Sequence, residues 1–143
     1  MRADMQKLKE FAAQNNLNFE TIANKRYIDY FSSSVPKNKS DDVCSRFIDE
    51  MSNIVECTVF PMPPSEIIKA IYNRLNLNCG VTENIKIIAS NCYLLNKLSS
   101  FEIFTLLWLV SCRNMMCFNE ELYLIFANNG TIGRLLLALA NSN

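Results

Sequence analysis

The segment from Phe101 to Cys112 constrains the fold more than any other part of this sequence. Drawn as a helix, it is apolar on nearly every side, although it contains Glu102 and Thr105. A helix that is apolar all round is normally the central one, around which other helices pack. The segment is also too short to cross a bilayer, which takes about 20 residues. We therefore expect a buried helix over about residues 101–113, at the centre of the fold.

Apolar residues recur every three or four positions through most of the remaining chain, which is the period of an amphipathic helix. Segments with this pattern begin near residues 3, 19, 41, 65, 82, 120 and 132. Three glycines and four prolines in 143 residues are few for an all-β protein, which needs many tight turns. The sequence thus predicts an all-α, single-domain bundle of about seven or eight helices.

Breaks in the helical pattern mark the connections. The polar, proline-containing run over about residues 32–40 predicts a flexible loop, and the prolines within residues 61–64 predict an extended connection. Ser99 followed three residues later by Glu102 is a capping-box pattern, which predicts the start of the central helix. No internal repeat or low-complexity tract appears, so we expect residues 1–143 to form one domain.

The chain contains no histidine, which removes the commonest general base and most catalytic zinc sites. The adjacent acids Asp41–Asp42 and Glu120–Glu121 open predicted helices, where the helix dipole accounts for them. None of the six cysteines forms a C-x-x-C pair, and three glycines cannot build a glycine-rich phosphate loop. We therefore expect a protein that is not an enzyme, with no catalytic residue, cofactor or metal.

The N-terminal residues mix charges of both signs and lack the apolar core of a signal peptide. Most of the cysteines lie among apolar residues in helical patterns, which is typical of reduced, buried thiols. We expect an intracellular protein, cytoplasmic or nuclear, that is neither secreted nor attached to a membrane. Asparagine, isoleucine and lysine are plentiful, as in the AT-rich genomes of many large DNA viruses and parasites, so a viral protein is part of this expectation.

Half of the residues are hydrophobic, and several short amphipathic helices carry large apolar side chains on more than one face. Such a composition is typical of a protein that buries apolar surface against a partner. The leading hypothesis is a protein–protein interaction module that associates with itself, as a homodimer or larger homo-oligomer. Candidates for its exposed apolar surface are Phe11, Tyr27, Tyr30, Phe60, Met62, Met115, Met116 and Phe118.

A second hypothesis is a nucleic-acid-associated factor. The fourteen basic residues balance the fourteen acidic ones, but the first 40 residues are the most basic part of the chain. A basic patch with nearby aromatic side chains is the pattern that binds phosphates and stacks bases. Candidate residues are Lys25, Arg26, Lys37 and Lys39, with Tyr27 and Tyr30 beside the first two.

Residues 125–136 resemble the first homology segment of Bcl-2 proteins. In that segment an apolar residue and Phe precede an Asn-Trp-Gly-Arg core, and an apolar helix follows. Phe126, Gly133 and Arg134 match, whereas Thr131 and Ile132 replace the asparagine and the tryptophan. The resemblance implies a helical bundle whose groove receives an amphipathic partner helix. Gly133 would then permit close approach, and Arg134 would pair with an acidic residue of the partner.

Overall fold

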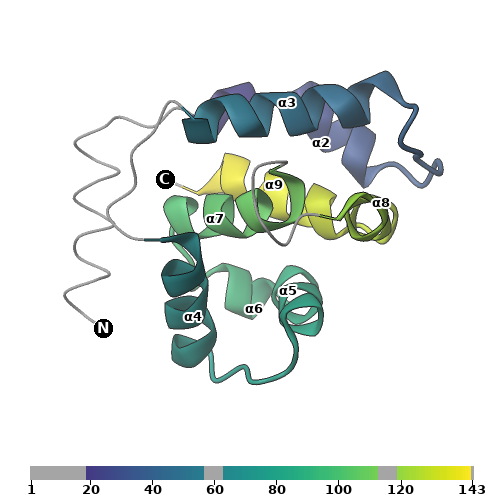
Figure 1. Cartoon of the computed structure of the whole chain (residues 1–143). Coiled ribbons are helices and arrows are strands. Elements are labelled where there is room, and N and C mark those ends of the chain that lie inside the picture. Colours follow the sequence, from purple (N-terminus) through teal and green to yellow (C-terminus); the bar gives the residue numbers. More distant parts are fainter. Residues whose placement is uncertain (1–18, 57–62, 113–118, 143) are drawn as a thin grey trace.

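The computed structural model describes residues 19–56, 63–112 and 119–142. These residues form eight α-helices and one short 3-10 helix, η1, without any strand, which confirms the all-α class. The helices lie in three layers (Figure 1). The upper layer holds α2 (Lys25–Ser32) and α3 (Asp42–Glu56), the middle layer α7 (Ser100–Ser111), α8 (Glu120–Asn128) and α9 (Thr131–Asn141), and the lower layer α4 (Pro64–Arg74), α5 (Val81–Ala89) and α6 (Cys92–Leu95). η1 spans Phe19–Thr21.

Helix α7 lies at the centre, as the sequence predicts. All of its residues except Ser100 and Leu109 are buried, and it packs against helices of the upper and lower layers. The predicted capping box is present at its start. The Glu102 backbone N–H donates to Ser99 Oγ at 3.2 Å, and the Ser99 backbone N–H donates to Glu102 Oε1 at 2.8 Å. Ser99 therefore fixes the point at which the central helix begins.

Glu102 also joins the lower layer to α7, which the sequence pattern did not reveal. Its side chain is 1% exposed, and the Arg74 guanidinium at the end of α4 donates to Oε1 at 3.0 Å and lies 2.7 Å from Oε2 in an ion pair. The same guanidinium donates to the backbone carbonyl of Lys97 at 3.2 Å. A buried carboxylate is stable only when it is paired and hydrogen-bonded. The contacts with Arg74 therefore offset the desolvation cost of burying Glu102.

Interlocking aromatic rings fill the interface between the upper and middle layers. Phe31 is fully buried, and its ring centroid lies 4.9 Å from that of Phe47 and 6.4 Å from that of Tyr123. Tyr27 packs edge-on against Phe47 at 5.2 Å. Such edge-to-face pairs add about 0.5–1.5 kcal/mol each to the stabilisation from burial alone. Two residues of α2 thus bind that helix to α3 and to the middle layer.

Gly133 lets α9 approach α2 more closely than any side chain would allow. A Cβ atom at this position would lie 2.6 Å from the backbone carbonyl oxygen of Phe31. Because the obstacle is backbone, it cannot move aside as a flexible side chain could. The small residue therefore serves the packing of two helices within the chain.

Two helix boundaries differ from the sequence prediction, and in both cases an asparagine explains the difference. The helix expected from Asn18 begins at Lys25, because the Asn24 side chain accepts from the Tyr27 N–H and caps α2. The helix expected from residue 82 to about 95 is interrupted at Asn91, whose side chain accepts from two backbone N–H groups of α6. Asparagine prefers caps to helix interiors because its side chain competes for backbone hydrogen bonds.

The two predicted connections are partly described. Pro63 and Pro64 fall at the N-cap and first residue of α4, where proline is favoured because no backbone N–H is needed there. Residues 57–62, with the first part of the proline-rich connection, lie outside the described residues. The loop over residues 32–40 is anchored at Lys37, whose backbone N–H donates to Asn128 Oδ1 at 2.8 Å while Asn128 Nδ2 donates back to its carbonyl. The expected flexibility of the rest of this loop stays a prediction.

Candidate functional site

A groove of about 590 Å³ opens between the middle and lower layers, beside α9. We call it the Arg134 groove. One wall is the outer face of α9, where Arg134, Leu137, Ala138 and Asn141 follow one another at the spacing of a single helix face. The opposite wall comes from the end of α5 and from α6, and the start of α7 completes the groove. Its other described lining residues are Ala89, Ser90, Cys92, Leu95, Asn96, Leu98, Ser99, Ser100, Ile103 and Ser142.

The Arg134 groove exists because α9 buries one face in the core and leaves another face exposed. Ile132, Leu135, Leu136 and Leu139 point into the core and are at most 3% exposed. The face that carries Leu137 is left uncovered, and this leucine is 48% exposed. A single exposed leucine is ordinary on a protein surface, but here it lines a concave surface together with Leu95, Leu98 and Ile103. Leu137 is therefore the main exposed apolar side chain that the groove offers to a ligand or partner.

Arg134 is the only charged side chain among the described residues that line this groove. It is exposed, and no carboxylate in the described parts of the chain forms an ion pair with it. Gly130, which precedes α9 with a φ of +88°, leaves room beside the guanidinium, since a Cβ atom there would lie 3.4 Å from Cζ. The groove thus combines leucine and isoleucine side chains, uncharged polar side chains and one cation that is open to an anionic group.

The three residues of the Bcl-2-like segment do not line a common surface. Phe126 is fully buried and forms part of the floor of a different hollow, between α4, α5, α7 and α8. Gly133 faces the backbone of α2. Only Arg134 reaches the groove. The close approach that Gly133 permits is therefore made within the chain, and an interaction with a partner is left to Arg134 alone.

The four basic residues of the nucleic-acid hypothesis do not form a common exposed patch. Lys37 is 6% exposed, and its ammonium donates to the Ser33 carbonyl and lies 5.7 Å from the centre of the Tyr30 ring. Lys25 forms an exposed ion pair with Asp29 at 2.6 Å. Arg26 and Lys39 are exposed. The sequence could not show that the Lys37 side chain turns inward, because that depends on the hydrogen bonds that Asn128 makes with its backbone.

The predicted apolar surface also needs correction. Tyr27 is 1% exposed and belongs to the aromatic core, so its assignment to an exposed surface was wrong. Tyr30 is only partly exposed. The other six candidates lie outside the described residues. The large apolar side chains that are exposed in the described part of the chain are instead Val35, Val81, Tyr93, Ile125 and Leu137.

A polar cluster beneath the upper layer resembles a reactive site only superficially. The Tyr30 hydroxyl donates to Asp41 Oδ2 at 2.7 Å and lies 3.3 Å from Cys44 Sγ, and Tyr123 donates to the Cys44 carbonyl at 3.1 Å. Burial raises the pKa of the Cys44 thiol and of both tyrosines. A thiol with a raised pKa is a poor nucleophile. The cluster joins α2, α8 and the residues that open α3.

The remaining sequence hypotheses can be compared only with the described residues. Within them, no group of three or more cysteine or acidic side chains could hold a metal ion. Cys44 and Cys112 are buried, as expected, whereas Cys79 and Cys92 are exposed, and all four are free thiols.

No single helix in the described part of the chain is long and apolar enough to cross a membrane. Helices α8 and α9 pass that test only when taken together, across a bend of 71°.

Comparisons of the chain with protein-family models, with curated proteins and with solved structures find no match. Sequence reasoning found Arg134 through its local resemblance. It missed Leu137 and the opposite wall of the groove. The cap residue Asn91, which separates α5 from α6, was the feature of the sequence that could have indicated this wall.

Proposed function

We propose that this protein is a non-enzymatic interaction module whose Arg134 groove binds an amphipathic helix of a protein partner. One observation carries the proposal. Arg134 is the sole charged residue in the described lining of a groove that mixes apolar and uncharged polar side chains, and no described acidic residue pairs with it. An acidic residue on the apolar side of a partner helix would satisfy the guanidinium. Arginine binds a carboxylate through two parallel hydrogen bonds, which fixes the register of the partner.

The shape of the groove fits a helix better than an extended strand. Its long wall is itself a helix, and its apolar residues are spread along α9 and the start of α7. An amphipathic helix presents apolar side chains at positions i, i+3, i+4 and i+7, which matches such a wall. No exposed strand edge exists in the described residues to pair with an extended peptide. The role implied for Arg134 by the Bcl-2 resemblance agrees with this arrangement.

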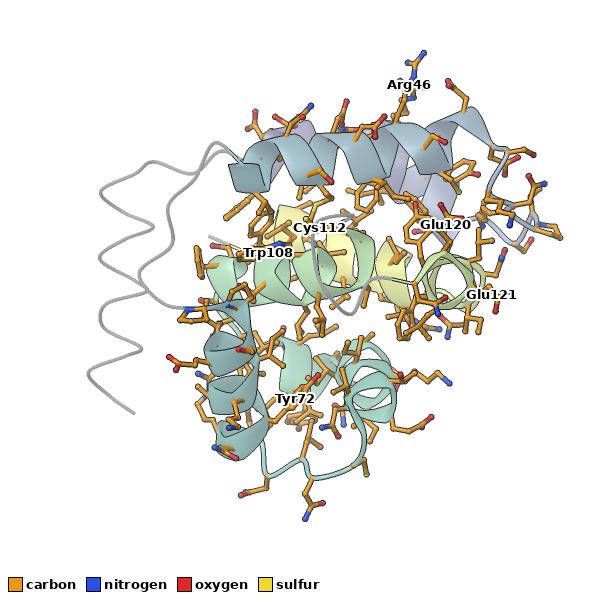
Figure 2. The ribbon with its side chains drawn as sticks, in the orientation of Figure 1. Arg46, Tyr72, Trp108, Cys112, Glu120 and Glu121 are labelled. Carbon is orange, nitrogen blue, oxygen red and sulfur yellow. The ribbon has the colours of Figure 1, made fainter. Side chains whose placement is uncertain are left out.

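A labelled peptide tests the proposal. We would use a synthetic helical peptide of about 16 residues, with leucines at helical spacing and one aspartate between them, and measure fluorescence anisotropy with the full chain. Arg134→Ala should weaken binding about tenfold, since a charge-assisted hydrogen bond is lost. Leu137→Asp should weaken it at least as much, because it places a carboxylate on the apolar wall. Arg46→Ala is the matched control, since Arg46 is an exposed arginine on α3 that points away from the body (Figure 2).

Charge reversal separates a specific contact from general attraction. A peptide with lysine in place of the aspartate should bind the native chain weakly and should recover affinity for Arg134→Glu. The proposal fails if Arg134→Ala and Leu137→Asp both bind the aspartate peptide as tightly as the native chain does.

Light scattering in reducing buffer shows whether the partner can be a second copy. A dimer that Leu137→Asp converts to a monomer would identify the occupant as this same chain.

A further inference from the structure

A second hollow lies between α4, α5, α7 and α8, on the side of α7 and α9 away from α2 and α3. We call it the apolar pocket. Its volume is about 490 Å³, within the range of small-molecule sites. Figure 2 shows Tyr72 between α4 and α5, where it forms part of the lining. The other described lining residues are Ser65, Ile68, Lys69, Val81, Thr82, Ile85, Leu109, Val110, Asn119, Leu122 and Phe126.

The residues that line the apolar pocket range from fully buried to exposed. Phe126 and Ile85 belong to the core and are 0% and 1% exposed. Val81, at the start of α5, is 55% exposed although it is large and apolar. Besides Lys69 and the hydroxyl of Tyr72, the polar side chains of the described lining come from Ser65, Thr82 and Asn119. An apolar chain inserted here would cover surface that now contacts water, and its polar end would remain near these side chains.

One cation stands among these residues. Lys69 is exposed, and it is the only charged residue in the described lining. None of the ion pairs in the described residues includes it. The nearest acid along α5, Glu83, lies outside the lining and within 3.5 Å of the Lys86 ammonium. The pocket is therefore complementary to a molecule that is apolar along most of its length and carries one negative charge at an end.

We infer that the apolar pocket binds a small anionic amphiphile of the fatty-acid type. Its hydrocarbon chain lies along Ile85, Leu122 and Phe126, and its carboxylate lies near the Lys69 ammonium. This site is separate from the Arg134 groove, since no described residue lines both. Binding here needs neither Arg134 nor a protein partner, so the two proposals can fail independently.

Chain length and head group test the inference with the full protein. Octanoate, decanoate and dodecanoate, each below its micelle-forming concentration, would be titrated by calorimetry. Affinity should rise about fourfold for each CH₂ group buried, until the chain fills the pocket. Lys69→Met should weaken dodecanoate about three- to fivefold and leave dodecan-1-ol unchanged, because an exposed ion pair contributes only modestly. Lys86→Met is the matched control on a lysine outside the pocket.

A blocking variant guards against non-specific adsorption. Val81→Trp places an indole at the mouth of the pocket, and it should abolish dodecanoate binding while the circular dichroism of the native fold persists. The inference is overturned if affinity does not depend on chain length, if Val81→Trp binds as well as the native chain, or if Lys69→Met and Lys86→Met are indistinguishable with dodecanoate. Arg134→Ala should have no effect on any of these titrations.

Discussion

The two interfaces of the middle layer differ in how completely they are filled. Toward the upper layer, the large rings of Phe31, Phe47 and Tyr123 interlock, and Gly133 brings two helix backbones together. Toward the lower layer, two hollows of about 490 and 590 Å³ remain. The side of α7 and α9 that faces α2 and α3 is thus filled, whereas on the other side hollows remain beside the buried isoleucines.

The difference has a physical origin in the sequence. The upper helices are uninterrupted, and their buried faces carry aromatic residues that reach across the interface. In the lower layer, Asn91 separates α5 from the four-residue α6, and the buried side chains of α4 and α5 are mostly aliphatic. Aliphatic side chains reach less far across an interface than aromatic rings do. Besides the buried isoleucines of α4 and α5, the lower interface contains the ion pair of Arg74 with Glu102.

The largest expected effect concerns the filled interface. Phe31→Ala should lower the free energy of unfolding by about 4 kcal/mol, because it removes a fully buried ring and leaves a cavity among rigid neighbours. Urea denaturation followed by circular dichroism measures the change. Ile125→Ala is the control, since Ile125 is 51% exposed and its loss should change stability by less than about 0.5 kcal/mol. Equal effects for the two variants would show that the upper interface is not tightly packed.

The second prediction concerns the attachment of the lower layer. Arg74→Met should destabilise the protein by about 3 kcal/mol, the lower end for a broken buried ion pair, because Arg74 itself is 30% exposed. The loss arises from the Glu102 carboxylate, which stays buried without its cation. Arg74→Met combined with Glu102→Gln should therefore be more stable than Arg74→Met alone. A double variant that is less stable than both single variants would contradict this explanation.

The third prediction tests the close contact of α2 with α9. Gly133→Ala should cost about 2 kcal/mol, since the added methyl group would collide with the Phe31 carbonyl and force the helices apart. Gly80→Ala is the matched control, because no atom lies within 4 Å of a Cβ at that position. Its net effect should be below about 1 kcal/mol, since alanine caps a helix less well than glycine but restricts the unfolded chain. Similar melting temperatures for the two variants would remove the steric argument.

The smallest expected effect is the acid sensitivity of the upper layer. The hydrogen bond from the Tyr30 hydroxyl, together with the backbone N–H of Asn38, lowers the pKa of Asp41 from its ordinary value of 3.8. A carboxylate whose pKa is lower in the folded state stabilises the fold above pH 3.8, and this contribution is lost as the pH falls through the folded pKa. Asp41→Asn should therefore show a smaller loss of stability between pH 6 and pH 3 than the native chain, measured by urea denaturation. Asp42→Asn is the comparison on the neighbouring acid, and a pH dependence that both variants share would exclude a specific role for Asp41.

Local patterns in the sequence predicted much of the fold. The apolar segment at 101–112 identified the central helix, and Ser99 with Glu102 identified its first turn, because both features depend on residues close together in the chain. The same reasoning could not show that Glu102 pairs with Arg74 or that Lys37 turns inward, since those contacts join residues 28 and 91 positions apart. Tyr27 was misplaced for a related reason. When a helix carries large apolar side chains on more than one face, the neighbouring helices decide which of those faces is buried. The sequence of the helix alone does not show where those neighbours lie.

The candidate site was predicted only through Arg134. The remainder of the groove consists of ordinary leucines, serines and small residues from α6, α7 and α9, which no motif brings together. Their relation arises from packing, because α9 uses one face for the core and leaves the other uncovered. A resemblance of a dozen residues can single out an arginine for testing, but it cannot show which surface that arginine faces.

The most direct test of the contrast between the two interfaces is a map of amide shifts in a ¹⁵N-labelled full chain titrated with the aspartate-containing peptide. The account predicts that perturbed amides gather in α6, at the start of α7 and along the outer face of α9, including Leu95, Leu137 and Ala138. Amides of α2 and α3 should stay unchanged. Shifts centred on the upper layer, or saturating peptide without any shift in α9, would contradict it.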